Sequence, residues 1–435
     1  MKAAPSRARL GILWLSHLVP YPPRGGVLQR SFNLLRSVAE RHDVHLLAFN
    51  QRALLPTAEA LERSVVELRR FCASVHVLPI PSDERPLGRQ RTYLRSLVSA
   101  RPFTARWLHS KDMEGRIREI LARHHIDLAH VDTISLATFA RLLANYGRVL
   151  NHNGVESQMM AQRASLERNP AARFYMAQEA WKLRRYETAV CGAFDLNVTC
   201  SCLDSTRLAG HVPGVMVEEI PNGVDLSYFR PTGGQEEERS LVAVGGMTWY
   251  PNRRAMIWFA RDIWPLLKRE EPDVCMTVIG REPPPEVVRL GQRDPAYRAV
   301  GFVEDIRPVV ARAQVYVCPL RDGGGTRLKV LDALAMGKAM VAHPIAVEGI
   351  DVKPGEHVLI AETPKQFVEK IRLLFATPEL RTRLAEEGRR LVEEKYDFER
   401  IGAKLNRLYD GIVARRRDGS SPGLGGRGPT GTAAF

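Results

Sequence analysis

The chain has 435 residues, which is too long for one ordinary core. Of these residues 45% are hydrophobic and 26% charged, a composition typical of folded globular proteins. It contains no run of 18 or more apolar residues, so we predict no transmembrane helix. The net charge of +14 is uneven, because residues 1–215 hold 30 Lys and Arg against 18 Asp and Glu, whereas residues 216–435 hold 33 against 31.

Short apolar runs alternate with amphipathic stretches along the whole chain. In the first half we expect strands at residues 10–16, 44–49, 75–80, 128–131, 149–152 and 196–200, with helices that include 27–41, 57–71, 114–124 and 171–191. In the second half we expect strands at 241–246, 275–280, 314–320, 339–342 and 358–361, and helices at 255–268, 326–336, 364–376, 378–396 and 398–415. This alternation predicts an α/β protein with two doubly wound parallel sheets, each in a Rossmann-like domain.

The restart of the alternation predicts a domain boundary near residue 215. We expect a first domain at residues 1–215, a second at 216–396, and a C-terminal helix at 397–415 that packs back on the first. The tail, residues 416–435, is rich in Gly, Ser, Pro and Arg and is expected to be disordered. Parallel sheets bind ligands at the carboxyl ends of their strands, so we expect a cleft there.

The most informative segment is a glycine-rich turn between an apolar strand and a helix. The turn consists of Gly323, Gly324 and Gly325. Glycines let the backbone approach a ligand closely, and a helix start offers free N–H groups and partial positive charge. We expect Thr326 to cap the helix, with Arg327 and Lys329 adding full positive charge. The pattern predicts a phosphate site, and the alternative is a plain tight β–α turn.

The excess positive charge is densest between Arg85 and Arg118. The basic residues there are Arg85, Arg89, Arg91, Arg95, Arg101, Arg106, Lys111, Arg116 and Arg118. Apolar residues interleave at helical spacing, which predicts basic amphipathic helices on an anionic membrane surface. The alternative is a solvated basic face whose apolar residues pack inward. No nucleic-acid-binding motif is recognisable, so we expect no specific nucleic-acid partner.

Six cysteines are present, without the spacing of a zinc or redox pair, and no Asp-x-Asp pattern for a divalent ion occurs. We therefore expect no metal, no cofactor and a reducing cytoplasmic location, with peripheral attachment to the inner face of the cell membrane.

Five segments resemble retaining glycosyltransferases of family 4, which have the GT-B fold of two facing Rossmann-like domains. These are the loop 22–26 with Arg30, the strand end 127–132, the linker 220–225, the turn 244–252, and the glycine-rich turn with its helix. Segment 153–157 is similar to the branch encoded with exopolysaccharide export systems. The likeness covers about residues 10–412.

The resemblance implies transfer of a sugar from a nucleotide-diphosphate sugar to a lipid-linked or polysaccharide acceptor, with retention of anomeric configuration. The implied donor-binding residues are Gly25, Gly26, Asn222, Arg253, Arg254, Gly323, Gly324, Gly325, Thr326, Arg327, Lys329 and Asp332. Gly324 and Asp332 stand where the family usually has two glutamates. Among the cations, Lys329 is expected to hold the diphosphate more than Arg253.

His130 and Asp132, at the end of a strand, are the candidate catalytic residues, which would orient the acceptor or take its proton. For His130 the alternative is a strand-end histidine hydrogen-bonded for structure. Glu156 faces either the cleft or water, and Arg30 is expected to pair within the first helix.

Other functions stay open from the sequence. They are a GT-B nucleotide-sugar epimerase, a non-catalytic glycosyltransferase-like subunit, which Gly324 favours, and a basic nucleic-acid-binding protein.

Overall fold

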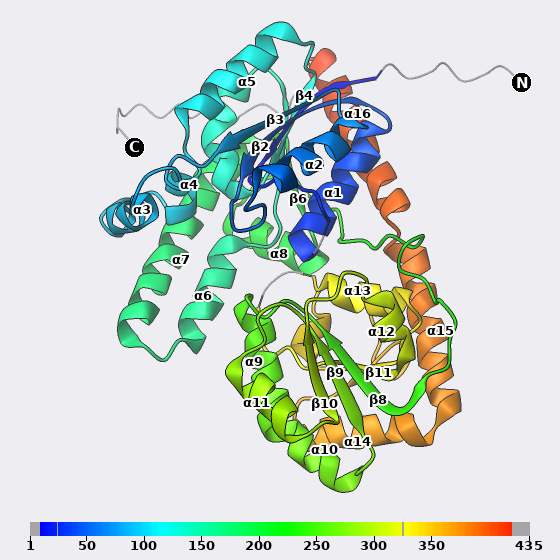
Figure 1. Ribbon diagram of the computed structural model, residues 1–435. Helices are drawn as coiled ribbons and strands as arrows, with labels where there is room; N and C mark the ends of the chain where they lie inside the picture. The colour runs from blue at the N-terminus through cyan, green and yellow to red at the C-terminus, as the bar shows by residue number, and fades with distance from the viewer. Residues whose placement is uncertain (1–8, 24, 324–325, 420–435) are drawn as a thin grey trace, which may run out of the picture. The chain divides into compact units, whose positions relative to one another are not determined.

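The computed structural model describes residues 9–23, 25–323 and 326–419 and divides into two α/β units (Figure 1). The first unit comprises the chain up to Ile220 together with the chain from Ile401 on, and the second comprises Pro221–Arg400. The second unit is therefore one continuous segment, whereas the first is assembled from two. The boundary expected near residue 215 lies slightly earlier than the observed one. Most of the expected tail, residues 420–435, lies outside the described residues.

The first unit contains a parallel sheet of seven strands in the order β3-β2-β1-β4-β5-β6-β7. The strands are β1 (Gly11–Ser16), β2 (Asp43–Asn50), β3 (Ser74–Pro79), β4 (Leu128–Asp132), β5 (Gly147–Asn151), β6 (Leu196–Thr199) and β7 (Val217–Glu219). The central strands are almost entirely apolar because helices cover both faces. The expected strands correspond to β1–β6, and β7 was missed because its three residues give no periodic signal.

Alternate residues of β1 enter two separate cores. Ile12 and Trp14 pack with α1, α2 and α16, whereas Leu13 and Leu15 pack with α5, η1 and α8 on the other face. These elements are α1 (Gly26–Ala39), α2 (Ala58–Arg69), α5 (Lys111–Arg123), the 3₁₀ helix η1 (Ile134–Leu143), α8 (Cys202–His211) and α16 (Phe398–Arg417). A short 3₁₀ turn, η2 (Cys191–Ala193), precedes β6.

Four further helices of the first unit are α3 (Gly88–Leu97), α4 (Phe103–Trp107), α6 (Glu156–Leu166) and α7 (Pro170–Val190). The helices α6 and α7 run alongside each other, and α3 packs against α7 (Figure 1). Of the four, α7 was expected, α3 and α4 lie in the segment where basic amphipathic helices were expected, and α6 was missed.

The second unit contains a parallel sheet of six strands in the order β10-β9-β8-β11-β12-β13. The strands are β8 (Glu237–Val244), β9 (Cys275–Ile279), β10 (Tyr297–Gly301), β11 (Ala313–Cys318), β12 (Met340–Ala342) and β13 (Leu359–Ile360). In β11, Val315 and Val317 face one core and Tyr316 and Cys318 the other. The edge strand β10 was missed because only Tyr297 is buried along it.

The helices of the second unit cover both faces of this sheet. They are α9 (Tyr250–Trp258), α10 (Trp264–Glu270), α11 (Pro285–Arg293), α12 (Arg307–Arg312), α13 (Leu328–Ala335), α14 (Pro364–Ala376) and α15 (Pro378–Lys395), with a 3₁₀ turn η4 (Pro344–Val347). A π-helical turn, η3 (Phe259–Ile263), joins α9 to α10 just before Pro265, which has no N–H to donate. None of the described helices is long and apolar enough to cross a membrane.

Candidate functional site

The carboxyl ends of β8 and β9 meet at two glycines that leave no room for a side chain. A Cβ on Gly280 would lie 2.0 Å from the carbonyl oxygen of Gly245. A Cβ on Gly245 would lie 2.3 Å from Nζ of Lys329 and 2.7 Å from Nδ2 of Asn252. The glycines therefore let two strand ends and one ammonium group converge at the edge of the sheet.

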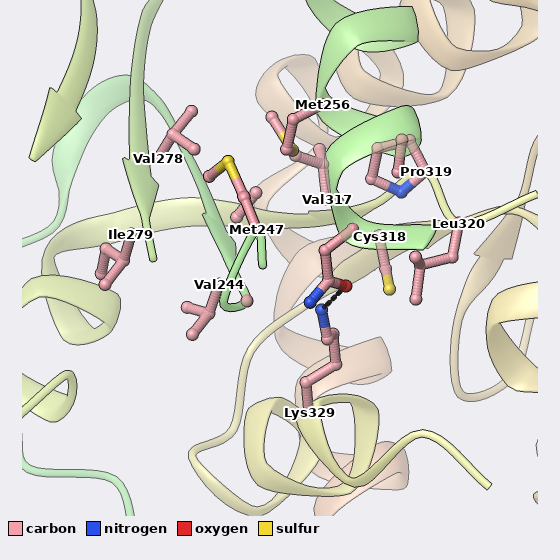
Figure 2. Close-up of a pocket in the computed structure, with 14 residues that line it drawn as sticks. Val244, Met247, Met256, Val278, Ile279, Val317, Cys318, Pro319, Leu320 and Lys329 are labelled. Carbon is pink, nitrogen blue, oxygen red and sulfur yellow. Dashed lines mark hydrogen bonds between the residues drawn. The ribbon is translucent and has the colours of Figure 1, made fainter. Parts of the chain in front are cut away.

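Lys329 reaches this edge from the first turn of α13. Its Nζ donates a hydrogen bond to Oδ1 of Asn252 at 2.5 Å, drawn as a dashed line in Figure 2. Nδ2 of Asn252 in turn donates to the carbonyl of Gly246 at 2.8 Å. Part of the Lys329 side chain remains exposed, yet burial of the ammonium lowers its pKa to about 8. The group is thus mostly charged at neutral pH, and an anion bound to it would raise its pKa again.

The Lys329–Asn252 pair forms the polar end of a small pocket (Figure 2). The other lining residues are mainly apolar and include Met247, Val278 and Leu320. Its volume of about 20 Å³ holds about one water molecule. A nucleotide is far larger, so the ammonium is available only to a group that approaches the pocket from outside.

The glycine-rich turn begins beside α9. Gly323 has φ 100°, and a Cβ there would lie 3.2 Å from Trp249 and from Pro251. The guanidinium of Arg327 donates to the Gly323 carbonyl at 2.5 Å. Arg254 forms an ion pair with Asp322 at 2.9 Å. Gly324 and Gly325, expected to contact the donor, lie outside the described residues.

The prediction that Thr326 caps α13 is wrong. The helix begins at Leu328, with Arg327 in the N-cap position and no capping side chain. The carbonyl of Thr326 instead accepts a hydrogen bond from Nδ2 of the buried Asn222 at 3.3 Å. Asp332 lies further along α13 and is buried, and Arg253 is exposed on α9.

His130 lies in the core of the first unit. Its ring stacks on Trp14 with centroids 3.7 Å apart, and its Nδ1 is 2.6 Å from the hydroxyl of Tyr409. The side chain has no exposed surface, and burial lowers its pKa to about 3. This environment favours the structural alternative for His130, because the ring would have to leave the core to meet an acceptor.

Asp132 is equally buried and is held in a hydrogen-bond network. Its carboxylate accepts from Oγ of Ser31 at 2.6 Å and from Nδ2 of Asn151 at 2.7 Å. Burial opposes ionisation, but His17, His130 and these two donors outweigh it and hold the pKa of Asp132 below its usual value. A carboxyl kept ionised in this way is a poor proton acceptor.

Arg30, expected to pair within its own helix, hydrogen-bonds to groups outside it. Its guanidinium donates to the carbonyl of Ile220 at 2.7 Å and to Oδ1 of Asn151 at 2.9 Å. It therefore joins α1 to the ends of other strands. Gly25 and Gly26, at the start of α1, are both exposed, and Gly25 has φ 100°.

Glu156 is the first residue of α6 and is partly exposed. Its carboxylate accepts from Oγ1 of Thr133 at 2.8 Å, and Thr133 has φ 119°, which is unusual for a β-branched residue. Burial, together with the charge of Glu187, raises the pKa of Glu156 to about 7. Its ionisation therefore lies close to neutral pH, as in groups that exchange protons at functional sites.

One group of described side chains has the proximity of a metal site, namely Glu356, His357 and Glu387. Nδ1 of His357 accepts from the backbone N–H of Lys353 at 2.9 Å, which leaves Nε2 protonated and unable to ligate. Glu387 is engaged by Arg390. These residues do not fit a metal ion.

Comparison with known proteins adds the fold relationship. Residues 238–377 match the family model described as "Glycosyl transferases group 1". The chain is similar in structure to sucrose-phosphate synthase from Thermosynechococcus elongatus (TM-score 0.66, 16% identity, 93% of this chain and 100% of that one). It is also similar to HepE from Anabaena, in a structure with UDP and glucose (TM-score 0.64, 14% identity, 93% and 100%).

The fold is GT-B. A protein of 44.6 kDa from the cps region of Klebsiella pneumoniae is 22% identical over 173 residues, which cover 38% of this chain. That alignment spans 45% of the relative's length. The region that matches the family model contains Gly245, Asn252 and Lys329.

Gly245 and Asn252 belong to the turn 244–252 that carries part of the family resemblance, but they were not among the expected site residues. The signal for Gly245 is a pair of glycines directly after an apolar strand. Asn252 lies 77 residues from Lys329 in the chain, so only the fold brings the two together.

Proposed function

We propose that the protein is a glycosyltransferase that moves a sugar from a nucleotide-diphosphate sugar to a lipid-linked or polysaccharide acceptor, with retention of anomeric configuration. The second unit binds the donor, and the reaction serves exopolysaccharide or other cell-surface glycan synthesis. The enzyme works in the cytoplasm at the inner face of the cell membrane.

The observation that carries the proposal is the Lys329 ammonium, fixed by Asn252 at the carboxyl edge of the second sheet. In parallel α/β sheets this edge is where ligands bind. The start of α13 adds the partial positive charge of a helix N-terminus beside the ammonium. This combination suits a diphosphate.

The same groups account for the chemistry. When the bond between the sugar and the β-phosphate oxygen breaks, negative charge develops on the leaving phosphate, and Lys329 stabilises it in place. The sugar carbon forms its new bond to an acceptor hydroxyl on the same face, and the proton of that hydroxyl passes to the leaving phosphate. No group besides the protein, donor and acceptor is required.

The comparisons support the class of reaction. The family match includes the donor-side residues, and HepE, which shares the fold, has been crystallised with UDP and glucose. The cps-region relative supports a role in surface polysaccharide synthesis.

The test is a thermal-stability screen of the full chain with UDP, GDP and their sugar conjugates. We expect one nucleoside diphosphate to raise Tm, since a ligand at 100 times its Kd adds about 2.7 kcal/mol of stability. The increase should be lost in Lys329→Ala and kept in Lys365→Ala, which removes an exposed lysine of α14. Stabilisation by none of these ligands would contradict the proposal.

A transfer assay then separates the reaction types. Incubation of the sugar nucleotide with a lipid extract should yield a glycosylated lipid of the donor's anomeric configuration, read by NMR. Conversion of the sugar nucleotide to its epimer without an acceptor would instead identify an epimerase.

A further inference from the structure

Two helices of the first unit expose large apolar side chains to solvent. On α3 and its flanks, Leu87 is 63% exposed, Leu94 61% and Val98 92%, and on α7 Phe174 is 72% and Trp181 55% exposed. Clustered exposed apolar residues of this size mark interaction surfaces.

The exposed residues follow the geometry of each helix. Leu94 of α3 and Val98, the residue after its last turn, are four positions apart and lie on one stripe, and Leu87 directly precedes the helix. Phe174 and Trp181 are also seven positions apart and share a stripe of α7. We call these two stripes, with the arginines among them, the outer face of α3 and α7.

The two helices are firmly attached to each other through different side chains. Nζ of Lys182 donates to the Ser96 carbonyl at 2.6 Å, and Nε2 of Gln178 donates to the Leu97 carbonyl at 3.0 Å. The rings of Tyr93 and Tyr175 lie 4.8 Å apart. These contacts fix the spacing of the two stripes.

The charge of α3 and of the segment that follows it has one sign. Residues 85–107 contain six arginines and no Asp or Glu. Arg91 lies within the apolar stripe of α3, and Arg185 stacks on the Trp181 ring at 4.8 Å. On α7 the carboxylates of Glu179 and Glu187 are buried and hydrogen-bonded, so they do not offset this charge.

This surface differs from the one expected from the sequence. The expected basic segment ran from Arg85 to Arg118, but Leu108 and Met113 are buried in the core of the first unit. The second half of that segment, α5, therefore turns its apolar face inward. Phe174 and Trp181 take its place from a different part of the chain.

We propose that the outer face of α3 and α7 binds the surface of a bilayer that contains anionic lipid. This inference rests on the proposed function, since a lipid-linked acceptor brings the reaction to a membrane. Trp and Phe side chains insert at the headgroup level, and arginines pair with lipid phosphates. Nucleic acid would satisfy the arginines but would leave the aliphatic stripe of α3 exposed to water.

The experiment is sedimentation of the full chain with vesicles of phosphatidylglycerol and phosphatidylcholine, and with vesicles of phosphatidylcholine alone. We expect strong binding to the first and weak binding to the second. Arg91→Gln with Arg95→Gln should weaken binding about 25-fold, since each arginine near an anionic surface contributes about fivefold. The triple variant Val98→Ser, Phe174→Ser, Trp181→Ser should weaken it about tenfold or more.

Matched controls come from α2, in the same unit. Val66 on α2 is 51% exposed, and Arg63 and Arg69 are exposed beside it, so Val66→Ser with Arg63→Gln and Arg69→Gln should bind vesicles like the wild type. All substituted side chains are on the surface, and an unchanged Tm checks that each variant folds.

Several results would overturn the proposal. They are absence of vesicle binding by the wild type, equal binding to both kinds of vesicle, equal losses in the α2 control, and duplex DNA binding of similar strength that the same variants lose. Failure of the proposed function gives a different result. If the protein binds vesicles but no nucleoside diphosphate, the membrane surface is supported and the glycosyltransferase proposal is contradicted. Lys329→Ala should bind vesicles normally.

Discussion

The two units differ in how deeply they bury the polar groups at the carboxyl edge of their sheets. In the first unit, Asp132 and His130 are fully buried and closed into networks with partners from α1, β5 and α16. In the second unit, Lys329 keeps an exposed part and borders a small pocket. The carboxyl edge of the sheet thus carries a buried polar network in one unit and, in the other, a partly exposed ammonium that reaches it from α13.

The difference shows that a polar strand end is not by itself a functional site. What decides is whether the polar groups are enclosed by the protein or remain partly exposed.

The largest effect is expected for Asp132→Ala. Its loss leaves the buried donors Ser31 and Asn151 without their acceptor and removes one of the negative charges near the buried guanidinium of Arg30, which typically costs about 3–5 kcal/mol of unfolding free energy. Urea unfolding followed by circular dichroism measures it. Asp43→Ala removes a half-exposed carboxylate paired with Arg9 and should cost less than about 1 kcal/mol. Full stability of Asp132→Ala with loss of transfer would restore a catalytic role.

Lys329→Ala should act on the reaction rather than on the fold. Removing a fixed positive group beside a developing charge typically costs about 3–4 kcal/mol in the transition state, so kcat should fall about a hundredfold or more. A steady-state transfer assay measures the loss, with Lys365→Ala as the control. A variant that unfolds as the wild type does but turns over at its full rate would refute the phosphate role.

Glu156→Gln should change how stability depends on pH. Burial and Glu187 raise the folded-state pKa of Glu156 to about 7, so the folded chain keeps a proton that the unfolded chain has released above about pH 4.5. Stability from this group is therefore fully present at low pH and falls as pH rises towards 7, by up to about 3 kcal/mol.

The glutamine variant should lack this fall, as read from unfolding midpoints between about pH 4.5 and 8. Glu167→Gln, next to the other end of α6, should behave as the wild type. An identical slope in wild type and Glu156→Gln would show that the Thr133 contact leaves the carboxyl ionised throughout.

The smallest effect is expected for Arg254→Gln. Its ion pair with Asp322 is half exposed on the arginine side, so unfolding free energy should change by less than about 1 kcal/mol. We expect nucleoside diphosphate binding, measured by calorimetry, to weaken much less than in Lys329→Ala. If Arg254→Gln weakened nucleoside diphosphate binding as much as Lys329→Ala does, the diphosphate would instead lie at Arg253 and Arg254 of α9.

Much of the fold was predictable because parallel strands buried on both faces are read directly as apolar runs. The strands β1 and β11 and the turn before Lys329 are examples. The start of α13 was placed too early. Thr326 is of a residue type that often caps helices, but the chain stays extended through Arg327 and the helix begins at Leu328.

The role of His130 was harder to predict for a different reason. Tyr409, which hydrogen-bonds it, lies 279 residues away in α16, so nothing near His130 in the sequence says that the strand end is covered. The exposed stripe of α7 was missed because a helix with apolar residues on both faces has no clear periodicity. Pairs such as Lys329 and Asn252 likewise depend on tertiary structure.

The first unit is interrupted by the second, and this sets the order in which a newly made chain can finish folding. The ribosome completes the whole of Pro221–Arg400 before it releases the helix whose Ile401, Leu405 and Tyr409 fill the core beside β1. During synthesis the second unit can therefore fold while the first unit still lacks its C-terminal helix. A premature stop near residue 400 would leave the second unit complete and would remove part of the hydrophobic core of the first.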